Sequence, residues 1–403
     1  MPHHTALIST VAVGLVYALI GGLIAARLRL PPLVGYLVAG IAVGPFTPGF
    51  VADVTLAPQL AEIGVILLMF GVGMHFSMGD LLAVRKIAVP GALVQIAAAT
   101  SLGAVLAHFW GWGFGPGLVF GLALSVASTV VLLRALEAQG TLQSENGRIA
   151  VGWLIVEDLV TVIVLVLLPT LAGVLGGQTG AADGEGSHLL LTIGLTLGKV
   201  TAFAALMAAG GARVLRFLLA RVERTGSGEL FTLAVAAIAL GVAYGSAELF
   251  GVSFALGAFI AGMVINGSDL SHRAARDLQP LQDAFGVLFF VAVGMLFDPA
   301  ILVQQPGQVM AVVAVIVAGK SLVAFVLVIV FRYPLSVGVT IAASLAQIGE
   351  FSFIVGELGL SLRLLPKEGV SLIVAGALIS ITLNPLLFAF GRRFERPVGA
   401  EAA

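Results

Sequence analysis

The chain has 403 residues, of which 59% are hydrophobic and only 10% are charged, and its net charge is −1. A soluble domain carries roughly 25% charged residues, so much of this chain must have a lipid bilayer as its solvent. The near-zero charge gives no electrostatic basis for binding nucleic acid. Because the chain contains no cysteine, disulfides, thiol catalysis and thiolate metal sites are excluded.

Thirteen apolar stretches are predicted as membrane-spanning helices, since a span needs about 20 mostly apolar residues. In chain order they cover approximately residues 6–26, 32–46, 57–75, 87–109, 116–137, 148–174, 188–219, 229–247, 251–266, 281–297, 307–331, 335–360 and 366–391. The second and the ninth are short. We expect the first to be a retained helix and not a cleaved signal peptide, because the basic residues Arg27 and Arg29 follow it, whereas a signal peptide would have basic residues in front.

The distribution of basic residues predicts the orientation of the helices. With the N-terminus outside and thirteen crossings, one side of the membrane receives every Lys and Arg except Lys199, Lys320, Arg363 and Lys367. The positive-inside rule places that side in the cytoplasm, together with the C-terminus. We therefore expect a multi-pass protein of the bacterial inner (plasma) membrane.

Two adjacent carboxylates, Glu157 and Asp158, lie near the middle of the sixth predicted helix. An ionisable group at membrane depth is costly and marks a functional site by default. Adjacent helical positions point about 100° apart, so the two side chains cannot easily share one partner. We expect one carboxylate to bind a cation or a proton and the other to be paired. The alternative is a buried polar cluster that only locks helix packing.

Lys320 lies midway along the eleventh predicted helix and needs a counter-ion there. Glu157 or Asp158 is the obvious candidate. Such a pair would couple the protonation of the lysine to that of the carboxylate, whereas a static salt bridge would serve packing alone.

Two predicted helices contain a polar interruption: the twelfth, at Gln347, Gly349 and Glu350, and the fifth, at Ser125, Ser128 and Thr129. Interruptions of this kind mark broken helices whose freed backbone groups line a cavity. The two helices are seven crossings apart and so run in opposite directions. This placement predicts an inverted repeat, helices one to six against eight to thirteen, with the seventh helix (about 188–219) as a linker. Glu350 fits a structural and a functional role equally well.

No constellation of nucleophile and base, and no metal-ligand spacing of His and carboxylates, occurs in the sequence. The sequence therefore predicts neither an enzyme nor a protein with a cofactor or a bound metal beyond a transported monovalent cation.

Six segments resemble, in order and spacing, the Kef-type branch of the monovalent cation:proton antiporter-2 family, and more closely its YbaL-like members. They are residues 60–73, 122–129, 152–158, 253–262, 288–295 and 347–353. The resemblance covers nearly the whole chain and implies a NapA/Kef-like antiporter fold: an all-α polytopic membrane protein of about thirteen helices, with a dimerisation domain and a core that contains two crossed, discontinuous helices.

The same resemblance implies the roles of individual residues and the kind of transport. Asp158 matches the residue at which cation and proton compete, Glu157 the position before it, and Lys320 the core lysine that can pair with that position. Thr129 and Ser128 match the crossing beside the site. A homodimer is implied, and transport by elevator-type alternating access.

Two departures from the family pattern concern ion choice and regulation. Potassium-efflux Kef members usually have Gln-Asp where this chain has Glu157-Asp158, so the ion and the stoichiometry stay open. They usually also carry a C-terminal nucleotide-binding domain, which these 403 residues do not include.

The predicted function is exchange of a monovalent cation, K⁺ or Na⁺, for a proton at Asp158. Two alternatives stand beside it: a channel-like K⁺ efflux protein without obligatory exchange, and a membrane sensor or scaffold that carries no ions.

Overall fold

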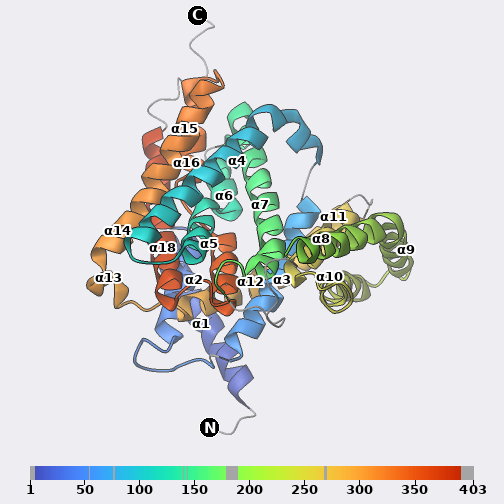
Figure 1. The fold of residues 1–403 in the computed structure, drawn as a ribbon. Helices are drawn as coiled ribbons and strands as arrows, with labels where there is room; N and C mark the ends of the chain where they lie inside the picture. The colour runs from blue at the N-terminus through green and yellow to red at the C-terminus, as the bar shows by residue number, and fades with distance from the viewer. Residues whose placement is uncertain are drawn as a thin grey trace, which may run out of the picture.

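A computed structural model describes residues 5–53, 55–75, 78–138, 140–142, 144–177, 189–266 and 270–391. All regular secondary structure in these ranges is helical (Figure 1). The elements are α1 (Ala6–Arg27), α2 (Pro32–Val43), α3 (Ala57–His75), α4 (Met78–Phe109), α5 (Phe114–Ser125), α6 (Thr129–Ala138), α7 (Glu145–Leu171), α8 (Leu189–Leu206), the π-helical turn η3 (Met207–Gly211), α9 (Ala212–Glu223), α10 (Gly228–Phe250), α11 (Phe254–Asn266), α12 (Ser271–Met295), α13 (Ile301–Gln304), α14 (Pro306–Ala314), the π-helical turn η4 (Val315–Gly319), α15 (Lys320–Val330), α16 (Leu335–Leu345), α17 (Glu350–Ser361) and α18 (Lys367–Gly391).

Each of the thirteen predicted stretches coincides with a helix or a broken helix. Ten helices in the described part of the chain are long and apolar enough to cross a membrane, and α16 with α17, bent by 43° at their junction, make an eleventh candidate. The helices at the two remaining predicted stretches, α2 and α11, have 12 and 13 residues. A helix of that length rises about 18–20 Å, less than the roughly 30 Å of a hydrocarbon core. Thirteen crossings therefore stay a prediction.

The start of the tenth predicted span was wrong. Hydropathy places it at residue 281, whereas α12 begins at Ser271. Most of the first ten residues of α12 are polar or charged, and an i,i+4 ion pair between Arg273 and Asp277 at 3.3 Å stabilises this part of the helix. A hydropathy window detects only the apolar part of a helix that continues beyond it.

The helices pack as two groups. The first group comprises α1–α3 and α10–α12, and the second comprises α4–α7 and α14–α18; within each group neighbouring helices make extensive contacts. The segment from α8 to α9 lies at one edge of the molecule, contacting α7 of the second group and α10 and α11 of the first (Figure 1). These two groups are not the two predicted inverted repeats, and the division of the chain into repeats stays a prediction.

Glycine lets helices approach closely, and it does so inside each group. A Cβ atom on Gly40 of α2 would lie 2.1 Å from the carbonyl oxygen of Val291 on α12, and one on Gly121 of α5 would lie 2.1 Å from that of Thr100 on α4. Among the described glycines, every approach closer than 3.0 Å joins residues of one group or lies within the α8–α9 segment. The helix–helix contacts inside each group are therefore tight backbone contacts of the kind that membrane bundles use.

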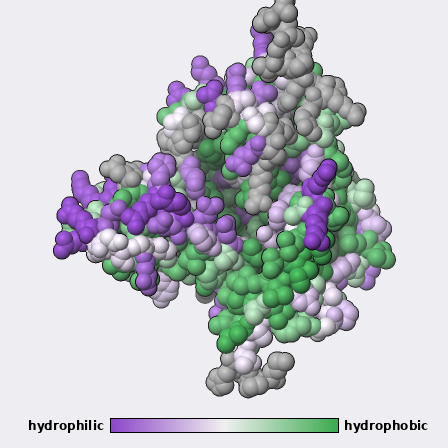
Figure 2. Space-filling model, turned by 180° about the vertical axis from the view of Figure 1, so that it is seen from behind, coloured by the Kyte–Doolittle hydropathy of each residue, from purple (hydrophilic) through white to green (hydrophobic). Residues whose placement is uncertain are grey.

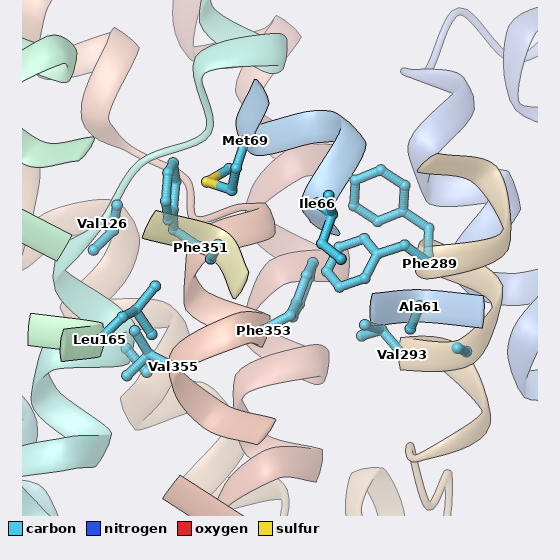
Figure 3. Packing of buried hydrophobic residues seen from close by; sticks show 14 of the residues in the cluster. Ala61, Ile66, Met69, Val126, Leu165, Phe289, Val293, Phe351, Phe353 and Val355 are labelled. Atoms are coloured by element: carbon cyan, nitrogen blue, oxygen red, sulfur yellow. The ribbon is translucent and has the colours of Figure 1, made fainter. Parts of the chain in front are cut away.

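Between the groups, the contacts that surround the site are made by apolar side chains. Figure 3 shows Phe289 of α12 and Ile66 of α3 beside Phe353 of α17. The ring centroids of Phe289 and Phe353 are 6.4 Å apart, and those of Phe290 and Phe353 are 6.3 Å apart. On the outside, large hydrophobic side chains of α1 are exposed, as on a surface that faces lipid, and Figure 2 shows a broad hydrophobic area low on the molecule.

Candidate functional site

Two helix breaks meet in the second group and form the centre of the candidate site. α5 ends at Ser125 and α6 begins at Thr129, while α16 ends at Leu345 and α17 begins at Glu350. The backbone N–H of Ser128 donates to Oε1 of Gln347 at 2.9 Å, and Nε2 of Gln347 donates to the carbonyl oxygen of Ser128 at 3.1 Å. This reciprocal pair joins segments 219 residues apart and satisfies backbone groups that the breaks leave without helical partners.

Two serine hydroxyls strengthen the junction. Oγ of Ser128 donates to Oε2 of Glu350 at 2.9 Å, and Oγ of Ser352 donates to the carbonyl oxygen of Val126 at 3.3 Å. All four residues are buried. Side chains from each break thus form hydrogen bonds with the other break: Ser128 reaches Glu350, whereas Gln347 and Ser352 reach the α5–α6 break.

Glu157 and Asp158, on α7, contact two different residues at the α5–α6 break. Glu157 accepts a hydrogen bond from the backbone N–H of Ala127 at 2.9 Å, and Asp158 accepts one from the hydroxyl of Thr129 at 3.1 Å. Their different partners follow from the 100° turn between adjacent helical positions. The second oxygen of Asp158, Oδ1, is buried without a hydrogen-bond partner.

The ammonium group of Lys320, at the start of α15, is fully buried and donates to the carbonyl oxygen of Gln347 at 3.1 Å. Among the ion pairs of the described residues none joins Lys320 to Glu157, although the two charges interact electrostatically. The indole of Trp153, one turn before Glu157 on α7, also lies near that carboxylate. The pairing of Lys320 with Glu157 stays a prediction.

A cavity of about 640 Å³ lies between the two helix groups and reaches the site. Asp158, Glu350 and the half-buried Thr129 line it from the second group. Asp283 of α12 and His75 of α3, both exposed, line it from the first group. The cavity thus extends from an exposed mouth to two buried carboxylates.

The opposite end of the site is closed. Along α17, Glu350 lines the cavity, Phe353 is buried among the aromatic rings shown in Figure 3, and Glu357 lines separate pockets beyond them. Along α3, His75 and Leu68 line the cavity, whereas Glu62 lines one of those further pockets. An apolar layer therefore separates the site from the other end of the molecule, and access is one-sided.

Of the predicted site residues, the structure brings Asp158, Thr129, Ser128, Glu350 and Gln347 together at the crossing, with Glu157 and Lys320 beside it. Gln95 of α4 was not predicted. It is fully buried, and its Nε2 donates to the carbonyl oxygen of Ser125, the last residue of α5, at 3.1 Å. The cost of polar groups at membrane depth, applied to amides as well as to charges, could have found it.

Ionisable side chains at a helix crossing, in a helical bundle that can span a membrane, define a class of protein: an ion transporter. The family described as "Sodium/hydrogen exchanger, transmembrane" matches residues 15–390. YbaL of Escherichia coli (strain K12), a protein assigned to the cation/proton antiporters, is 60% identical over 98% of this chain and 70% of its own length. The chain therefore belongs to the sodium/hydrogen exchanger family of cation/proton antiporters, which are transporters and not enzymes.

A more distant relative agrees with this assignment, and a solved structure has the same fold. K(+) efflux antiporter 4 of Arabidopsis thaliana is 33% identical over 95% of the chain, which spans 63% of the plant protein's length. The structure of the sodium proton antiporter MjNhaP1 from Methanocaldococcus jannaschii superposes with a TM-score of 0.64 at 17% identity, covering 95% of this chain and 99% of that one. At that identity the likeness concerns the fold alone.

Proposed function

We propose that this protein exchanges a monovalent cation for a proton across the membrane and that the two ions compete for Asp158. The observation that carries the proposal is the unpartnered Oδ1 of a buried aspartate that lines a cavity open to one side. A carboxylate in that position can hold a cation or a proton, but not both, and this exclusion couples the two fluxes.

K⁺ is the first cation to test. The plant relative is named as a K⁺ efflux antiporter, whereas the sodium named for the solved structure comes with an identity that supports the fold alone. Neither name decides between K⁺ and Na⁺ for this chain, because selection between them depends on the coordination shell.

The movement that carries the site is an elevator-type displacement of the second helix group against the first. Three features support it: the cavity lies between the groups, the tight glycine contacts lie inside them, and the contacts between them around the site are made by apolar side chains. A homodimer formed through the first group would hold that group still.

We place the protein in the bacterial inner membrane with its N-terminus outside. In that orientation the mouth of the cavity adjoins the C-terminal end of α3 and the N-terminal half of α12, both on the side that receives most Lys and Arg residues. The structure would then represent an inward-facing conformation.

The test is proton flux in proteoliposomes driven by an imposed K⁺ or Na⁺ gradient. We expect the unaltered protein to show exchange with a fixed ratio of the two ions, and Asp158→Asn to abolish it. Glu357→Gln, on the far side of the apolar layer, is the matched control and should keep exchange. Activity retained in Asp158→Asn would refute the assignment of this residue. Cation flux without coupled proton movement would favour a channel, and no flux at all a sensor or scaffold.

A further inference from the structure

Glu350 lies beside Asp158 at the inner end of the cavity. Glu350 is tethered to Ser128 and Asp158 to Thr129, and these two partners are adjacent residues at the end of one helix break. Both carboxylates line the same cavity although they come from different helices, α17 and α7. The cavity therefore ends at a pair of acidic groups and not at a single aspartate.

A structural role is available for Glu350 without any ligand. It is the first residue of α17, and a carboxylate at a helix N-terminus is favourable because the helix dipole is positive there. That role requires only that the carboxylate stay near the first turn of α17. It does not explain why the side chain lines the cavity, or why the neighbouring aspartate has a buried oxygen without a partner.

A cation between the two carboxylates accounts for both features. Two buried carboxylates on one cavity repel each other when both are ionised, and a positive charge between them turns that repulsion into attraction. Oδ1 of Asp158 supplies an unused oxygen, and the Thr129 hydroxyl oxygen lies 3.1 Å from the other oxygen of Asp158. Oxygen groups of this kind are the ligands of hard cations.

We propose that Glu350 is a second direct ligand of the transported cation, which binds between Glu350 and Asp158. This inference rests on the proposed antiport function and adds a specificity-determining residue to it. Two carboxylates create a stronger field than one, and the field strength of the ligands is one of the factors that separate small from large cations. Glu350 should therefore influence both the affinity for the cation and the preference between Na⁺ and K⁺.

The experiment compares Glu350→Gln, Glu350→Asp and Asp158→Asn with the control Glu357→Gln, which lies two turns further along the same helix. The apparent KM and the maximal rate are measured for Na⁺ and for K⁺ in proteoliposomes. Thermal stabilisation of the purified protein by the same two salts reports binding without transport, with choline chloride as the ionic-strength control.

We expect Glu350→Gln to raise the apparent KM for the cation about tenfold, and to raise it more for Na⁺ than for K⁺. Glu350→Asp keeps the charge but draws it back by one methylene group, so it should change the Na⁺-to-K⁺ ratio in the same direction as Glu350→Gln and by less. The thermal stabilisation should shift to higher salt in parallel, and Glu357→Gln should resemble the unaltered protein in every respect.

A purely structural Glu350 would lower the maximal rate or the melting temperature and leave the ratio of the two KM values unchanged, and that result would overturn the inference. If Glu350→Gln does not fold, Glu350→Asp decides: the shorter carboxylate must alter the ratio if it is a ligand, and an unaltered ratio overturns the inference. Exchange that survives in Asp158→Asn would contradict the proposed function itself. Loss of exchange in Asp158→Asn together with unchanged values in Glu350→Gln would contradict only this inference.

Discussion

The buried ammonium group of Lys320 takes part in two interactions, one as a hydrogen-bond donor and one as a charge. Its hydrogen bond to the carbonyl oxygen of Gln347 lies just beyond the end of α16, where the carbonyl groups of a helix terminus carry partial negative charge. Its charge also acts on Glu157. A neutral donor could form the hydrogen bond to Gln347, but only a cation can act electrostatically on Glu157. The two roles can therefore be separated by substitution.

Lys320→Gln keeps N–H donors near the Gln347 carbonyl while removing the charge. We expect the variant to fold and to exchange ions, but to move a different net charge in each cycle, because one ionisable group has left the site. Current measurements on proteoliposomes adsorbed to a solid-supported membrane test this. Lys320→Ala, which loses the donor as well, should be less stable than Lys320→Gln by about 1–3 kcal/mol. Equal charge movement in Lys320→Gln and the unaltered protein would contradict a role for the lysine charge in transport.

At the scale of helices, the junction of the two breaks depends on the absence of a side chain at Gly349. A Cβ atom there would lie 2.2 Å from Cβ and 2.7 Å from Cα of Ser128. Neither atom can move without displacing the start of α6. The hydrogen bonds between Ser128 and Gln347 require this close approach, so the glycine and the polar residues of the junction act together.

Gly349→Ala should therefore abolish transport and lower the melting temperature of the purified protein. The physical reason is overpacking against backbone, which typically costs 1–3 kcal/mol and sometimes more. Gly245→Ala in α10, where an added Cβ would meet nothing within 4 Å, is the matched control and should be neutral or slightly stabilising. Full activity in Gly349→Ala would show that the junction can open without loss of function.

The helices that carry the site could be predicted from the sequence, but their contacts could not. Apolar length located the helical stretches, and polar residues at membrane depth located the breaks near Ser128 and Gly349. The reciprocal hydrogen bonds of Ser128 and Gln347 depend on how two distant segments approach in space, which a single sequence does not record. The same limit applies to Lys320: the sequence showed that its ammonium group needs a partner, but not that this partner is a backbone carbonyl oxygen.

The whole molecule combines two well-packed helix groups with a contact of a different kind between them. Inside the groups, glycines such as Gly40, Gly121 and Gly349 bring backbones together. Between the groups, the rings of Phe289, Phe290 and Phe353 meet in tilted and edge-on arrangements. The hydrophobic attraction between such side chains is non-directional, so one set of apolar contacts can be exchanged for a similar set, whereas interlocked backbones would resist displacement. The glycine pattern thus favours movement between the groups over deformation within them.

The one-sided mouth of the cavity offers a direct chemical readout of conformation. The chain has no cysteine, so a single thiol introduced by Asp283→Cys, at the exposed end of the cavity, reacts against no background. A maleimide that cannot cross the membrane should modify this thiol from the cytoplasmic face in inside-out vesicles. Glu357→Cys, beyond the apolar layer, should react only from the opposite face, and the reverse pattern would contradict the proposed orientation. A group that is exposed in one conformation only reacts in proportion to the population of that conformation. The rate of modification would therefore report the equilibrium between the inward-facing and outward-facing conformations in the absence of any ion gradient.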